Sequence, residues 1–238
     1  MQLLTLNMTL GMMENSLKLI IYGNGAMAKV LYSYIRSMHE VIAFTVDDHC
    51  VNSENGGFMG HPLLPFSQID QLLSSDEHQM IVAVGYKEMN SLRARKCTEA
   101  RQKGYRLASY IHPSVMRHEG VEFGENCIVL DHVSIHPDSR IADGTFISSN
   151  VNVGHDCSIG EMCWINAGVA IAGGAAIGAR SFLGVNASVA GDVKLGLASY
   201  IAANTLVNKA TDDEEVLISA AGEKFLLGSE AFLRFTRQ

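Results

Sequence analysis

The sequence predicts two domains of different architecture, an α/β domain followed by a parallel β-helix of six-residue repeats. Residues 122–211 divide into fifteen hexads without an insertion, and the second residue of every hexad is apolar. A strict period of six precesses around a helical wheel, so the hexads are predicted to be short strands that stack coil on coil. The preceding half alternates apolar strand patterns with helical ones and contains a G-x-G-x-x-A turn.

Residues 17–112 have the pattern of a small parallel α/β domain, Rossmann-like but too short for a complete dinucleotide fold. Strands are predicted at 17–22, 41–46, 80–84 and 105–111, and helices at 29–38 and 90–103. The preceding leader, residues 1–16, contains no Lys or Arg. It is therefore expected to be a flexible segment rather than a secretory signal.

The ends of the predicted strands indicate a nucleotide site. The first turn contains Gly23, Asn24, Gly25 and Met27, and the amides of the helix that follows can bind phosphate. Asp47 and Asp48 end the second strand, near the spacing at which a carboxylate meets a ribose or a base. The third strand leads into Gly85, Tyr86 and Lys87. A G-x-G-x-x-A turn is a weak signal by itself, and a tight packing turn is the alternative.

Three hexads are expected to form one triangular coil, which gives five coils and a prism roughly 24 Å tall. The third position of the hexad is rich in Gly and Asn, which is interpreted as corners that visit positive φ. We expect this domain to span residues 113–211 and the tail, residues 212–238, to cap the open end of the prism. The pattern leaves the handedness of the coils open.

Composition limits the possible partners. A formal net charge of −7 argues against nucleic acid or an anionic membrane surface. No apolar run approaches the roughly 20 residues of a membrane span, so a cytoplasmic protein is expected. Of five cysteines, Cys127, Cys157 and Cys163 occupy small inward positions, and no CxxC motif is present. These cysteines are interpreted as core fillers rather than metal ligands.

A half-size nucleotide domain joined to a hexapeptide prism resembles the bacterial sugar acyltransferases of the PglD and NeuD type. The most specific stretches are residues 20–23, the Asp47–Asp48 pair, Gly85 with Arg93, and Ser-Asn-Val-Asn-Val-Gly-His-Asp-Cys-Ser-Ile-Gly at 149–160. The resemblance implies a left-handed prism, a homotrimer and acetyl-CoA as cosubstrate, with no metal. It further implies N-acetylation of a UDP- or dTDP-linked 4-amino-4,6-dideoxy sugar for surface glycan synthesis.

The resemblance also assigns site residues. His155 matches the general base of the family and Asp156 the acid beside it. Imidazole suits this task because it can accept the proton of an attacking amine at neutral pH. Adjacent side chains on an extended segment point apart, however, so Asp156 is expected to serve a neighbouring group if it does not hold His155. Gly173, Gly174 and Ala203 match the positions that line the coenzyme.

The acceptor site departs from the family pattern. The bacillosamine-pathway enzyme has histidines where this chain has Met27 and Trp164. We expect Trp164, the only tryptophan, to form a wall of the acceptor pocket, with packing in a trimer interface as the alternative. Arg93 is assigned to the acceptor as well.

Other functions are considered beside N-acetylation. O-acylation of a sialic-acid-like sugar is the rival within the enzyme class, and a non-catalytic prism used as a scaffold is the rival outside it. His132, His136 and His155 also suggest the three-histidine zinc site of hexapeptide carbonic anhydrases. That family needs two histidines five residues apart and a third on a neighbouring prism, and this sequence has no histidine after His155.

Overall fold

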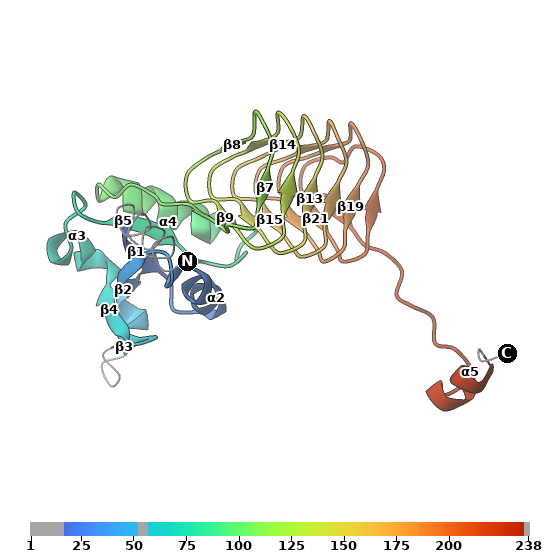
Figure 1. The fold of residues 1–238 in the computed structure, drawn as a ribbon, viewed down its shortest axis with the longest axis horizontal. Coiled ribbons are helices and arrows are strands. Elements are labelled where there is room, and N and C mark those ends of the chain that lie inside the picture. The colour runs from blue at the N-terminus through green and yellow to red at the C-terminus, as the bar shows by residue number, and fades with distance from the viewer. Residues whose placement is uncertain (1–16, 52–56, 236–238) are drawn as a thin grey trace, which may run out of the picture.

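The structure is a computed structural model that describes residues 17–51 and 57–235. The predicted leader, residues 1–16, lies outside the described residues. An α/β domain lies beside the first coils of a long prism of stacked strands, and the C-terminal tail extends away from the far end of the prism (Figure 1). None of the helices in the described part of the chain could span a membrane.

The α/β domain has a five-stranded sheet in the order β3-β4-β2-β1-β5, parallel except for the β3–β4 hairpin. Its elements are β1 (Lys18–Tyr22), α2 (Ala26–Ile35), β2 (Glu40–Val46), β3 (Gly57–Phe58), β4 (His61–Pro65), α3 (Ile69–Leu72), β5 (Gln79–Val82) and α4 (Ser91–Gln102), with short 3₁₀ helices at Asp48–Cys50 and Phe66–Gln68. The three predicted central strands and both long helices are confirmed. The hairpin and α3 were not predicted.

The prism is a left-handed parallel β-helix whose strands form three flat faces of six, five and seven strands. The six-stranded face consists of β7 (Met116–Arg117), β10 (Ser134–Ile135), β13 (Asn152–Val153), β16 (Ala170–Ile171), β19 (Ser188–Val189) and β22 (Leu206–Val207). The five-stranded face consists of β8 (Glu122–Phe123), β11 (Arg140–Ile141), β14 (Ser158–Ile159), β17 (Ala176–Ile177) and β20 (Lys194–Leu195). The seven-stranded face consists of β6 (Tyr110–Ile111), β9 (Ile128–Val129), β12 (Phe146–Ile147), β15 (Trp164–Ile165), β18 (Phe182–Leu183), β21 (Tyr200–Ile201) and β23 (Val216–Leu217).

The predicted hexads are confirmed in phase, and the prism is longer than predicted at both ends. Residues 110–111 were expected to close the α/β domain, but they form β6 and pair with β9. At the other end β23 pairs with β21. The apolar second position of each hexad fills the prism interior, where Cys127, Cys157 and Cys163 are almost completely buried.

The prediction that the third position of the hexad adopts positive φ was wrong. Positive φ occurs at the fifth position of the hexad instead, for example at Asn150 (φ 59°) and Asp156 (φ 55°). Glycine at the third position allows close approach between coils. A Cβ on Gly154 would lie 2.5 Å from the backbone nitrogen of Gly173 in the next coil.

The outward side chains of the seven-stranded face join the two domains. They are apolar or aromatic and recur every eighteen residues, at Tyr110, Ile128, Phe146, Trp164, Phe182 and Tyr200. The first five are buried in one cluster with side chains of β1, β2 and α2. The α/β domain therefore covers this face, and contacts between the domains fall on it or on its two edges.

The tail does not cap the prism, which contradicts the expectation. Ser219 Oγ donates to the carbonyl of Ala203 (3.0 Å), and residues 218–235 are exposed. The short helix α5 (Ser229–Phe235) lies far from the last coil (Figure 1). Because β23 has already extended the seven-stranded face, the chain leaves the prism from an edge.

Candidate active site

His155 lies at the corner between the six-stranded and five-stranded faces, directly after β13. Its Nδ1 lies 2.7 Å from a carboxylate oxygen of Asp156. The expectation that adjacent side chains point apart fails here because Asp156 adopts positive φ and turns back toward its neighbour. A carboxylate can only accept, so Nδ1 carries the proton and Nε2 is left free to act as a base.

The imidazole lies against Gly173 in the next coil. A Cβ on Gly173 would come within 2.5 Å of Nε2, 2.7 Å of Cε1 and 2.9 Å of Cδ2. The amide of Gly174 donates to the carbonyl of His155 (2.9 Å), which holds the two corners together. Gly173 and Gly174 thus lie beside the candidate base, at a corner that carries no side chain.

Ala203 lies elsewhere. It follows β21 at the corner between the seven-stranded and six-stranded faces, and it is exposed. The width of the six-stranded face separates it from Gly173. The three residues matched to the coenzyme therefore do not form one site within a single chain.

The glycine-rich turn lies at the carboxyl edge of the α/β sheet. Gly23 donates to the carbonyl of Thr45 (2.8 Å) and has φ +130°, and a Cβ there would lie 2.8 Å from the carbonyl oxygen of Ala83. Gly25 begins α2 without a side-chain cap, and a Cβ there would have no neighbour within 4 Å. With the exposed Asn24, this turn offers free helix amides to a ligand.

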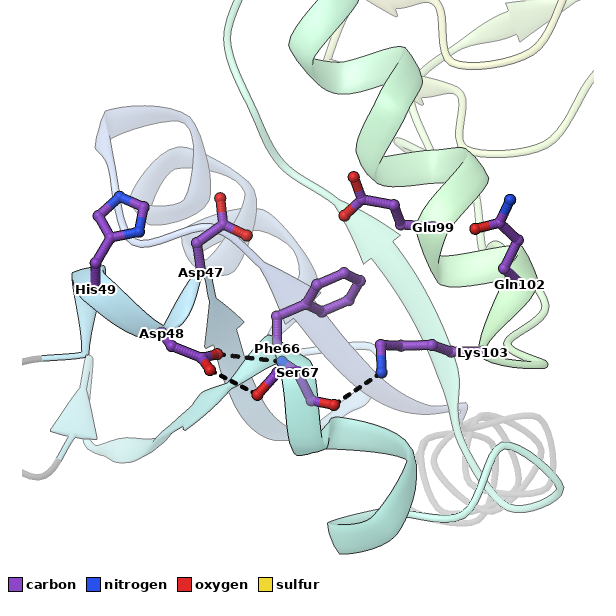
Figure 2. Close-up of a pocket in the computed structure, with 8 residues that line it drawn as sticks. All are labelled: Asp47, Asp48, His49, Phe66, Ser67, Glu99, Gln102 and Lys103. Carbon is purple, nitrogen blue, oxygen red and sulfur yellow. Dashed lines mark hydrogen bonds between the residues drawn. The ribbon is translucent and has the colours of Figure 1, made fainter.

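A pocket of about 500 Å³ opens at the same edge and is lined by Asp47, Asp48, His49, Phe66, Ser67, Glu99, Gln102 and Lys103 (Figure 2). Lys96 holds Asp47 and Glu99, each at 2.7 Å. Asp48 accepts from the hydroxyl (2.6 Å) and amide (3.2 Å) of Ser67, and these bonds hold the pKa of Asp48 below its usual range. Both predicted aspartates therefore line a cavity that is already open in the structure.

Arg93 and Trp164 belong to the domain interface, which corrects their assignment to the acceptor. Arg93 is 1% exposed, and it donates to the carbonyls of Met162 (2.9 Å) and Cys163 (3.2 Å). Burial lowers the pKa of Arg93 to about 10. Trp164 is 7% exposed and stacks on Phe146 with ring centroids 4.0 Å apart. The apolar contacts predicted for this indole come from its own chain.

The remaining predicted site residues lie either at the domain interface or near the carboxyl edge of the α/β sheet. Tyr86 packs its ring on Trp164 and Phe182 at the edge of the domain interface, although half of its surface remains exposed. Met27 packs partly against the cluster between the domains. Lys87 is exposed beside Gly85, close to the carboxyl edge of the sheet.

Sequence reasoning missed a polar network at the other edge of the seven-stranded face. Asp131 accepts hydrogen bonds from Ser149, from the hydroxyl of Tyr34 on α2 (2.8 Å) and from Nδ1 of His132 (3.0 Å). These bonds, that of Ser149 first, lower the pKa of Asp131 to about 2. The sequence gives little indication of this network, because Tyr34 and Ser149 are 97 and 18 residues away from Asp131.

In the described part of the chain, no three His, Cys, Asp or Glu side chains gather closely enough to hold a metal ion. His132 and His155, two members of the zinc set considered above, bind carboxylates at different corners of the prism.

Residues 18–99 match the PglD N-terminal domain family. Among solved structures, PerB from Caulobacter crescentus, in complex with CoA and GDP-perosamine, is 30% identical, with a TM-score of 0.74 over 84% of this chain and 92% of that one. The chain belongs to the family of this perosamine N-acetyltransferase. No curated protein matches the sequence.

Two further solved structures extend the comparison. A histidine variant of the perosamine N-acetyltransferase, again with CoA and GDP-perosamine, is 29% identical, with a TM-score of 0.76 over 85% of this chain and 93% of that one. The acetyltransferase domain of PglB from Neisseria gonorrhoeae, in complex with acetyl coenzyme A, is 22% identical with a TM-score of 0.75 and covers 85% of this chain and 96% of its own. The second likeness concerns the fold alone.

Proposed function

We propose that this protein is an N-acetyltransferase that moves the acetyl group of acetyl-CoA to the amine of a nucleotide-linked amino sugar, with His155 as general base. The observation that carries this is the His155–Asp156 pair with Nε2 free, lying on a glycine corner. Relatives of the same architecture bind CoA and GDP-perosamine. The proposal includes a role in surface glycan synthesis and a cytoplasmic location.

The chemistry follows from the geometry of the pair. As the sugar amine attacks the thioester carbonyl, Nε2 of His155 accepts the amine proton, and Asp156 stabilises the imidazolium through Nδ1. When the tetrahedral intermediate collapses, the C–S bond breaks, an amide remains on the sugar, and the proton passes to the departing thiolate. Gly173 and Gly174 leave room beside the base for the pantetheine arm.

The nucleotide is assigned to the α/β domain. Its diphosphate meets the Gly23–Gly25 turn and the amides that begin α2, which need no basic side chain. The nucleoside enters the pocket beside Asp47 and Asp48, where the ring of Phe66 offers an apolar surface. Two features support this assignment: the absence of any neighbour above Gly25, and the volume of the pocket.

A single chain cannot bring these parts together. The α/β domain covers the seven-stranded face, whereas His155 lies at the opposite corner of the triangle, between the other two faces. We therefore propose that the acceptor held by one chain meets His155 of a neighbour in a homotrimer. The separation of Gly173 and Ala203 supports the same arrangement, since a coenzyme between two prisms would touch different corners of each.

The six-stranded face is suited to the contact between chains. Apart from the exposed Arg117 at its N-terminal end, its outward side chains carry no charge; they are Met116, Ser134, Asn152, Ala170, Ser188 and Leu206. The five-stranded face instead exposes Glu122, Arg140 and Lys194, with a surface ion pair between the first two (3.1 Å). An uncharged flat face beside His155 favours association there.

The direct test is a thiol-release assay with acetyl-CoA against GDP-, UDP- and dTDP-linked amino sugars, each beside its hydroxyl analogue. We expect release only with amines and only with intact His155. Release with a hydroxyl acceptor alone would favour the O-acyltransferase reading. Absence of nucleotide binding and of release with all acceptors would favour a scaffold.

Assembly between chains is tested by mixing two inactive variants. His155→Ala removes the base, and Gly25→Val fills the space above the turn. If the site joins two chains, mixed trimers recover about one quarter of the sites, since one pairing in four is intact. Sites formed within one chain would recover none.

A further inference from the structure

Two histidines that the mechanism does not use lie on the same corner as His155. His118 and His136 occupy the first and second coils at the junction of the six-stranded and five-stranded faces, and their rings stack with centroids 5.1 Å apart and planes 24° apart. Both side chains are only partly exposed. The zinc set considered from the sequence included His136 but not His118.

The stacked pair and His155 share this corner at neighbouring positions of the hexad, the third for His118 and His136 and the fourth for His155. His118 donates its amide to Ile135 (3.1 Å) and His136 its amide to Val153 (2.9 Å), and Asp156 donates its amide to Pro137 (2.9 Å). These ladder bonds align His136 with Gly154 and Pro137 with His155, so the pair lies one and two coils before His155 and one position to its side. With strands about 4.8 Å apart, the three histidines cover about 10 Å along the prism.

The corner is chemically different on the two sides of His155. On the C-terminal side, Gly173 and Gly191 leave the corner bare. On the N-terminal side, the corner carries two imidazoles, and no hydrogen bond recorded within residues 17–51 and 57–235 engages their ring nitrogens. A bare corner suits a slender coenzyme arm, whereas ring nitrogens suit an oxygen-rich ligand.

The position of the α/β domain gives the direction of the acceptor. Most of the domain lies beside the N-terminal coils (Figure 1), and of its described residues only the segment with Glu88 and Met89 extends as far as Tyr200 of β21. In a parallel trimer, a sugar nucleotide delivered by a neighbour therefore arrives at His155 from the side on which His136 and His118 lie.

We propose that the stacked His118–His136 pair binds the acceptor, donating hydrogen bonds to oxygens of its sugar ring and diphosphate while His155 acts on the amine. This inference rests on the proposed function. The stacking holds each ring in place before the ligand arrives, so that little side-chain freedom is lost on binding.

The test replaces the nitrogens and keeps the ring. His136→Phe and His118→Phe preserve an aromatic stack, whereas His136→Gln keeps a hydrogen-bond donor. We expect His136→Phe to raise the Kd of the sugar nucleotide, measured by calorimetry, and its KM by about tenfold or more. The KM of acetyl-CoA should stay within about twofold, and His136→Gln should recover part of the loss. His132→Phe, at another corner, is the matched control.

The outcomes separate this inference from the proposed function. If the parent protein acetylates an amino sugar and both Phe variants keep the parent Kd and KM, the pair is only packing and the inference is wrong. An equal rise in both KM values, or loss of the trimer, also overturns it because it indicates a structural role. If the parent binds and acetylates no sugar nucleotide, both proposals fail together.

Discussion

The imidazole of His155 occupies the space where a side chain on Gly173 would begin, eighteen residues later and one coil further along the prism. This contact gives Gly173 a role that family resemblance alone did not provide, because the glycine makes room for the candidate base as well as for the coenzyme. The same corner carries the stacked histidines below and Gly191 above.

Gly173→Ala should lower turnover by displacing the ring, since its methyl group would lie 2.5 Å from Nε2. We expect a loss of about 10-fold to 100-fold in kcat. In the His155→Ala background the same change should have no further effect on kcat, a strongly non-additive pair. If Gly173→Ala instead raises the KM of acetyl-CoA equally in both backgrounds, the glycine serves the coenzyme alone.

His155→Ala should reduce turnover by roughly 10² to 10⁴, the usual contribution of a general base. The side chain is 67% exposed, so thermal stability should barely change. His132→Ala is the matched control because it removes the other histidine paired with a carboxylate. Turnover within threefold of the parent would remove His155 from the mechanism.

Trp164→Ala should destabilise the protein rather than change its choice of sugar. The indole is buried between Phe146, Tyr86 and Arg93, so its removal should cost about 3–5 kcal/mol in the free energy of unfolding. Denaturant titration measures this, with Leu72→Ala on α3, half exposed, as control. A stable variant with a selectively raised acceptor KM would restore the original expectation that Trp164 lines the acceptor pocket.

The hydrogen bonds to Asp131 should make the junction of α2 with the prism depend on pH. The pKa of this carboxyl is depressed to about 2 in the folded protein, so its stabilising effect is complete above the unfolded value, near 4, and is lost as pH falls toward 2. Asp131→Asn should therefore lower the melting temperature at pH 7 and lose this difference at low pH. A difference that is constant with pH would contradict this role.

The repeat made the prism predictable, because each strand depends only on its own hexad and its neighbours one coil away. The ends of the prism were harder to predict from the sequence. Tyr110 and Met116 begin hexads that continue the phase, but they precede the clean repeat and resembled the end of another domain. The β3–β4 hairpin is too short for a periodic signal.

A local motif can nominate site residues, but it does not show the contacts that they make between coils. His155 and Asp156 were proposed from their motif, and their mutual bond depends on the positive φ of Asp156. Arg93 and Trp164 were misassigned because their neighbours are distant in the sequence. The eighteen-residue recurrence of aromatic side chains was the available signal for Trp164.

The most direct measurement of the central claim is the structure of the reaction product. The purified protein, acetyl-CoA and a GDP- or UDP-linked 4-amino-4,6-dideoxy sugar should give one new species, in which NMR locates the acetyl group on the sugar nitrogen as an amide. His155→Ala should form the same product far more slowly. An ester on a hydroxyl group, or a product formed equally fast by the variant, would contradict the account.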